Sequence, residues 1–184
     1  MLHEGDALVA GGRCLKVLLR PGHSATDTLL LGPGGWAILG DHLLADAHSV
    51  TLLEPTREGG RRSRVLPRYR EALVATAALG LRRGFAGHGA VIADTSALAR
   101  RRVQGLDQRA RDVLANVSYE PTTAWELLTA RGHWRSRSGG AHPVAMPFLA
   151  LGQLLGLLDL LLARGVLEEL DDGRLVRYRQ PSAR

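Results

Sequence analysis

Cysteine and aromatic side chains are both scarce in this sequence, and each scarcity excludes something. Cys14 is the single cysteine, so the chain has no pair of thiols for an internal disulfide framework. Together with an acidic N-terminus that lacks an apolar signal segment, this favours a reducing compartment, the cytoplasm. Aromatic residues make up only 4% of the chain, so the core must be built from Leu, Val and Ala.

Long hydrophobic runs are also missing. The longest apolar stretch, residues 148–163, contains Gln153 and Asp159, and a membrane helix needs about 20 predominantly apolar residues. We therefore expect no membrane partner. The chain has 184 residues, of which 45% are hydrophobic, and these values predict a globular protein of one ordinary domain or two small ones.

Lysine is nearly absent, because Lys16 is the only lysine among 24 basic residues. The net charge of +6 is concentrated in residues 61–111, which hold twelve arginines and three acidic residues. An arginine-rich segment of this kind is typical of a solvated surface, and a GC-rich genome also favours arginine. Nucleic-acid binding through residues 61–111 is the alternative interpretation.

Short apolar runs separated by glycine predict two β-hairpins in the first 40 residues. One hairpin turns at Gly11-Gly12 and the other at residues 32–35. Together they form an antiparallel meander with His23 between the hairpins. A helix with Pro67 in its first turn is expected next, followed by a short Gly-rich strand within residues 84–92.

The sequence pattern becomes helical from Thr95 onward. Residues 95–117 predict a helix interrupted at Gly105, because glycine weakens a helix interior. A compact second helix follows, for which Thr122 or Thr123 can provide the N-terminal cap.

The C-terminal segment predicts a leucine-rich helix over residues 147–164 and a hairpin that turns at Asp172-Gly173. Helix, loop, helix and hairpin are the outline of a winged helix. We therefore expect three parts: a first domain over residues 1–94, a linker helix over 95–118 and a winged helix over 119–184.

Three polar side chains follow strand-like segments on glycine-flanked turns. These are His23 after Pro21-Gly22, Asp41 after Gly40, and His88 between Gly87 and Gly89. We expect all three to lie at one edge of the same sheet. Imidazole and carboxylate are ligands that zinc, iron and manganese accept.

In these stretches the chain resembles a known family. "RPGHSATDTLLL", "AILGDHLL" and "FAGHG" look like the last three metal-binding stretches of the metallo-β-lactamase-fold hydrolases, in the same order. "LGQLLGLLDLLLARGVLEELDDGRLVRY" is similar to the winged helix that some members append. The resemblance implies an α+β fold, namely the C-terminal half of an αββα sandwich followed by a helical linker and a winged helix.

The resemblance also implies the roles of individual residues. His23 would bind the first of two divalent metal ions, Asp41 would bridge both, and His88 would bind the second. Zinc is the expected metal, with iron or manganese as alternatives. The implied activity is metal-dependent hydrolysis of a small-molecule substrate, by water attack on an ester, thioester, lactam or phosphodiester. His48, on the loop after Asp41, is the candidate for contact with substrate, and plain solvent exposure is its alternative.

Neighbouring polar residues have two interpretations each. His42 either lines the site or supports it from behind. Asp27 and Asp46 either orient the metal ligands through hydrogen bonds or cap their own backbone, which is the more common role of Asp in a polar loop.

One part of the family pattern is missing. The hallmark H-x-H-x-D-H motif, which supplies the other ligands, does not occur in this sequence. We expect about a hundred residues to be absent, on the usual size of a domain, and an exposed half-sandwich that a partner chain or a second copy would cover. The chain is then an incomplete reading of an enzyme, one half of a split enzyme, or a degenerate, non-catalytic relative. A non-catalytic interaction subunit is one alternative function. An RNA- or DNA-binding protein or ribonuclease of the same fold is the other alternative.

Overall fold

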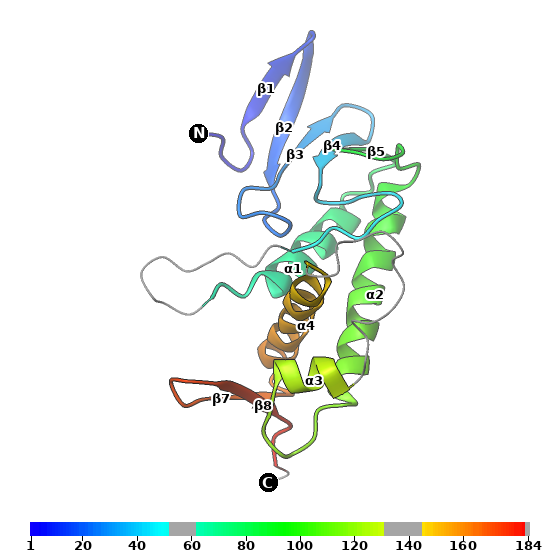
Figure 1. Cartoon of the computed structure of the whole chain (residues 1–184). Coiled ribbons are helices and arrows are strands. Elements are labelled where there is room, and N and C mark those ends of the chain that lie inside the picture. Colours follow the sequence, from blue (N-terminus) through cyan, green and yellow to red (C-terminus); the bar gives the residue numbers. More distant parts are fainter. Residues whose placement is uncertain (52–61, 131–144, 183–184) are drawn as a thin grey trace. The chain divides into compact units, whose positions relative to one another are not determined.

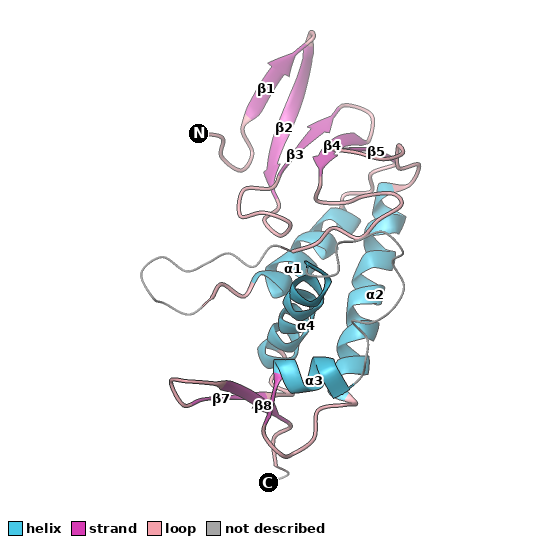
Figure 2. Ribbon diagram, in the orientation of Figure 1, coloured by secondary structure: helices cyan, strands magenta, loops and turns pink. Residues whose placement is uncertain are grey.

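The computed structural model describes residues 1–51, 62–130 and 145–182. The chain folds into two compact units, Met1–Gly105 and Leu106–Arg184. Both are mixtures of helices and strands (Figure 2), so the expected α+β class is confirmed. Within the described residues, no helix has the length and apolar content needed to cross a membrane.

The first unit contains a five-stranded sheet whose strand order follows the chain, β1-β2-β3-β4-β5 (Figure 1). Its first four strands are antiparallel neighbours, which confirms the predicted meander, and β5 pairs parallel to β4. Gly11 and Gly12 form the first hairpin turn with φ of 55° and 72°, a conformation that glycine adopts without strain. The strands are β1 (Ala7–Ala10), β2 (Arg13–Leu19), β3 (Thr28–Gly32), β4 (Trp36–Gly40) and β5 (Arg83–Ala86).

One face of this sheet is better covered than the other. Ala37 and Leu39 of β4 are buried, whereas Ile38 between them is 41% exposed. Phe85, the partner of Ile38 on β5, is 37% exposed. Successive side chains of a strand point to opposite faces, so the Ile38 and Phe85 side leaves apolar surface in contact with solvent.

Helix α1 (Val65–Ala78) contacts the loop after β4 through Tyr69 and Thr76, which bond to His42. Leu66, Tyr69, Leu73 and Thr76 are buried, and their spacing of three and four residues places them on one face of the helix. The chain then enters β5 and helix α2 (Thr95–Leu114).

The interruption predicted at Gly105 is wrong, because α2 runs through this residue without a break. The cost of one interior glycine is only about 1 kcal/mol relative to Ala, and buried apolar contacts on both sides of it, at Leu98, Ala99, Leu106 and Ala110, outweigh that cost. The division between the two units falls inside this helix, after Gly105.

The second unit contains β6 (Thr122–Thr123), α3 (Ala124–Ala130), α4 (Ala145–Ala163), β7 (Glu168–Asp171) and β8 (Val176–Arg179). Its three strands pair in the order β6-β8-β7, and the predicted hairpin at Asp172-Gly173 is confirmed. Thr123 caps α3: its hydroxyl oxygen accepts from the N–H of Glu126 at 3.2 Å, and the Glu126 carboxylate accepts from the N–H of Thr123 at 2.8 Å. This reciprocal pair is a capping box.

Candidate metal centre

The turn that carries His23 is fixed by the carboxylate of Asp27. Asp27 accepts from the N–H of His23 at 2.7 Å, from the N–H of Ser24 at 3.1 Å and from the Ser24 hydroxyl at 2.5 Å. Asp27 therefore caps its own loop, as one of its two interpretations expected. The rigid turn determines where the His23 imidazole lies.

The ring of His23 is oriented by a backbone carbonyl. Its Nδ1 lies 2.7 Å from the carbonyl oxygen of Val50; because a carbonyl can only accept, Nδ1 carries the proton. Nε2 is then left with its lone pair, 3.9 Å from Oδ2 of Asp41. Imidazoles that bind metals are almost always held in this way, with one nitrogen donating to a carbonyl or carboxylate and the other free to coordinate.

Asp41 and His88 come together because β4 and β5 are parallel neighbours. Each residue follows the carboxyl end of its strand, and the N–H of Gly87 donates to the carbonyl of Gly40 at 2.8 Å. Nε2 of His88 lies 3.8 Å from Oδ1 of Asp41. The expectation that three turns meet at one edge of the sheet is thus matched by the geometry: the two imidazoles face separate oxygens of a single carboxylate.

Gly87 makes this arrangement possible by having no side chain. A Cβ at this position would lie 2.4 Å from Oδ1 of Asp41, closer than non-bonded atoms can approach. The loop before His88 therefore needs glycine for space.

The donors fit the chemistry of a divalent transition metal, but their number does not complete a site. Two imidazole nitrogens and one carboxylate are ligands that zinc accepts, whereas a zinc centre normally has four ligands in total. Within residues 1–51, 62–130 and 145–182, no group of three or more His, Cys, Asp or Glu side chains is close enough to hold an ion by itself. The side chains of His23, Asp41 and His88 are 28%, 36% and 64% exposed, so their open side is accessible to further ligands.

His42 does not line this site. Its side chain is fully buried, and its Nε2 donates to the hydroxyl oxygen of Thr76 on α1 at 3.0 Å, since that hydroxyl donates its own proton to the carbonyl of Ala72. Burial lowers the pKa of His42 to about 4, although the charge of Asp27 opposes this shift. The residue after Asp41 therefore anchors the loop as a neutral imidazole.

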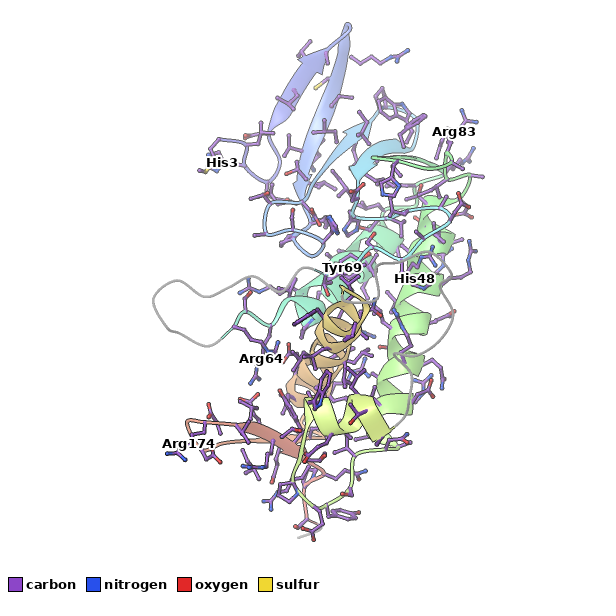
Figure 3. All side chains as sticks on the ribbon, in the orientation of Figure 1. His3, His48, Arg64, Tyr69, Arg83 and Arg174 are labelled. Atoms are coloured by element: carbon purple, nitrogen blue, oxygen red, sulfur yellow. The ribbon has the colours of Figure 1, made fainter. Side chains whose placement is uncertain are left out.

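His48 lies beside α2 in the first unit (Figure 3). Its Nε2 is 3.3 Å from Nη1 of Arg102, and Nη2 of the same arginine lies 2.8–3.2 Å from the carbonyl oxygens of Leu44, Ala45 and Ala47. Arg102 thus holds the loop that follows Asp41. His48 itself is exposed, as both of its interpretations allow. His133 and His142 lie outside the described residues.

Comparisons with known proteins concern the fold of the whole chain. No family model matches the chain. A stretch of 113 residues, 61% of the chain, is 32% identical to the "Probable metallo-hydrolase YqjP" of Bacillus subtilis (strain 168) and covers 35% of that protein. Two crystal structures are similar over 98% of the chain: a metallo-beta-lactamase family protein from Thermus thermophilus (28% identical, TM-score 0.76) and a beta-lactamase domain protein from Burkholderia ambifaria (23% identical, TM-score 0.81).

These likenesses support the metallo-β-lactamase-fold family. The chain spans about a third of the curated relative and about half of each of the two solved structures, 54% and 52%. The metallo-β-lactamase-fold likeness covers nearly all of this chain, so it includes the sheet edge that carries His23, Asp41 and His88.

Sequence reasoning did not find two residues that shape the site: Val50 and Arg102. Each acts through contacts between residues far apart in the sequence, such as the 27 positions between His23 and Val50. No local motif marks such contacts. In the sequence, Gly87 of "FAGHG" was the one indication that the loop before His88 lacks space for a side chain.

Proposed function

We propose that this chain supplies one part of the metal-binding site of a metal-dependent hydrolase of the metallo-β-lactamase fold. The observation that carries the proposal is the position of two imidazole Nε2 atoms, of His23 and His88, each within 4 Å of a different oxygen of Asp41. A carboxylate with one oxygen toward each imidazole is suited to bridge two ions.

In this proposal each residue has a distinct part. The Val50 carbonyl keeps the proton of His23 on Nδ1, so that Nε2 can donate a lone pair to the first metal ion. His88 binds the second ion from the loop after β5, and Gly87 leaves Asp41 the space to bridge. The bound metals, zinc or alternatively iron or manganese, would act as Lewis acids and activate water. The substrate would be a small molecule with an ester, thioester, lactam or phosphodiester bond, and exposed His48 would contact it.

The remaining metal ligands would come from further sequence joined to this chain or from a separate chain. Two facts support this: three donors leave a four-coordinate site incomplete, and Ile38 and Phe85 leave apolar surface on the sheet. We also propose that residues 119–184 form a winged helix. The order of β6, α3, α4 and the hairpin β7–β8 supports this, because helices followed by a hairpin are the outline of such a module.

Metal binding tests the proposal directly. The purified chain is dialysed against zinc, and its zinc affinity is compared with those of Asp41→Asn and of the control Glu71→Gln, which changes an exposed carboxylate of α1. We expect Asp41→Asn to weaken zinc binding by about tenfold or more, at least as much as the loss of an outer-shell partner does, and Glu71→Gln to leave it unchanged. Equal zinc affinities of wild type, Asp41→Asn and Glu71→Gln would reject the proposal.

Nucleic-acid binding remains a prediction for the arginine-rich residues 61–111. In the structure, Arg102 of this segment is engaged with backbone carbonyls and Arg111 with the side chain of Gln108, so these two guanidinium groups already have protein partners. Filter binding of RNA and DNA at several salt concentrations would show a steep salt dependence if the segment neutralised phosphates.

A further inference from the structure

Tyr69 contacts the loop of Asp41 from the side of α1. Its hydroxyl donates to the carbonyl oxygen of His42 at 2.7 Å, and its ring meets the His42 imidazole edge-to-face, with 5.7 Å between the ring centroids. Figure 3 labels this side chain on α1, below the loops that join the strands. This hydrogen bond holds the peptide group that contains the His42 carbonyl, one residue beyond Asp41.

The same ring also contacts the turn of His23. A Cβ on Gly22 would lie 2.2 Å from Cδ2 of Tyr69 and 2.8 Å from its Cβ and Cγ. Because Gly22 has no side chain, the Tyr69 ring can pack directly against its backbone. The turn is closed by the Gly22 N–H, which donates to the carbonyl of Ser24 at 2.9 Å.

One buried side chain thus touches the residue before His23 and the residue after Asp41. The two loops are separate in the sequence, and α1 follows both of them. A second bond from α1, between Thr76 and the His42 imidazole, limits movement of the Asp41 loop further. Because α1 is a rigid element, the ring and hydroxyl of Tyr69 can set the spacing of the two loops.

We propose that Tyr69 is the positioning residue of the candidate metal centre and sets the distance between the His23 imidazole and the Asp41 carboxylate. This inference rests on the proposed function for its metal readout, but the loop contacts can be tested without metal. Tyr69 itself touches neither metal nor substrate. Its effect passes through Gly22 on one side and the His42 carbonyl on the other.

The test is Tyr69→Phe, which removes the hydroxyl and keeps the ring against Gly22. In the metal-free protein, we expect faster amide hydrogen exchange in the peptide around Asp41 and His42, where the hydrogen bond is lost. Gly22→Ala should accelerate exchange in both loops, because the added methyl displaces the ring. Unchanged exchange in both variants would overturn the inference, whether or not the chain binds zinc.

Metal binding separates positioning from general stability. We expect Tyr69→Phe to weaken zinc binding about tenfold, in the range found for residues that orient ligands, and to alter the visible absorption spectrum of the cobalt-substituted protein. Leu73→Val is the matched control, since Leu73 is fully buried on the same helix. It should lower the unfolding temperature without changing the cobalt spectrum. If both variants changed zinc affinity and spectrum alike, the role of Tyr69 would be structural only.

The two proposals fail in different ways. If Asp41→Asn binds zinc as tightly as wild type, the proposed function fails, and the exchange measurements alone decide whether Tyr69 holds the two loops. If the chain binds zinc and Tyr69→Phe binds it with the same affinity and spectrum, the proposed function stands and the role of Tyr69 is rejected. Tyr119→Phe, an exposed tyrosine of the second unit, controls for the substitution itself.

Discussion

The imidazole of His23 donates its Nδ1 proton to the carbonyl of Val50 at 2.7 Å. This single bond determines which nitrogen of the ring is left for coordination. It also links the turn after β2 to Val50 in the segment that follows β4, so both sides of the candidate centre depend on it.

Our first prediction is therefore that the neutral imidazole of His23 carries its proton on Nδ1. Nitrogen-15 NMR of the metal-free chain, at a pH where free imidazole is neutral, should show a proton on Nδ1 of His23 and none on Nε2. His3, whose side chain is exposed, provides the comparison and should show an ordinary mixture of the two forms. A proton on Nε2 of His23 would contradict the assigned role of Val50.

Gly87→Ala should damage metal binding more than folding. The new methyl would meet Oδ1 of Asp41 at 2.4 Å, and the half-exposed carboxylate would have to turn away from His88. We expect zinc affinity to fall by about tenfold or more, as measured by competition with a chelator. Gly105→Ala is the control, because nothing lies within 4 Å of its Cβ; it should stabilise α2 by about 0.5–1 kcal/mol and leave zinc affinity unchanged.

Arg102→Met should destabilise the first unit. The variant keeps much of the aliphatic volume but leaves the carbonyls of Leu44, Ala45 and Ala47 without their guanidinium donor. Hydrogen bonds to a charged group contribute about 1.5–3 kcal/mol, so we expect the free energy of unfolding in urea to fall by about 2 kcal/mol. Arg101→Met, at an exposed neighbouring position, should change it little. Equal losses in both variants would show that Arg102 does not hold the loop.

The hairpin β7–β8 should weaken in acid. The backbone N–H of Leu175, followed by the side chain of Arg177 and the N–H of Arg174, lowers the pKa of Asp172 to about 2 from its ordinary 3.8. A carboxylate with a lowered folded pKa stabilises the fold above its unfolded pKa, and this contribution is lost as the pH falls from about 4 toward 2.

Asp172→Asn checks this pH dependence. Thermal unfolding should show a lower midpoint than wild type at pH 7, and the difference should shrink as the pH falls below about 4, where the native carboxyl becomes neutral too. Glu120→Gln, an exposed substitution in the same unit, should show no such trend. A difference that stays constant down to pH 2 would contradict the assigned role of the charge.

The sequence predicted those features that depend on neighbouring residues. The paired glycines Gly11-Gly12 marked the first hairpin, Thr122 or Thr123 marked the start of α3, and Asp172-Gly173 marked the last turn. The three candidate ligands followed from their glycine-flanked turns after strands and from the family resemblance. These patterns are local, so a single sequence contains them.

Features that depend on distant contacts were not predicted. Gly105 looked like a break, yet packing along α2 outweighs the small cost of one glycine. His42 had two interpretations until the structure showed it buried against Thr76, and nothing near Tyr69 in the sequence pointed to Gly22 or to His42. The identity of a helix side chain such as Tyr69 does not by itself specify which loops that side chain contacts in the folded protein.

The close approach of Gly22 and Tyr69 has a consequence for how related sequences can vary. A side chain at position 22 requires a residue smaller than tyrosine at position 69. Such a residue lacks the hydroxyl that donates to the His42 carbonyl. We therefore expect the two positions to covary, with glycine at the first wherever a tyrosine or phenylalanine occupies the second. Sequences that lack the Gly22–Tyr69 pair should also lack the aspartate at position 41. Without that aspartate, the position of the His23 turn is no longer under constraint, and its sequence can change.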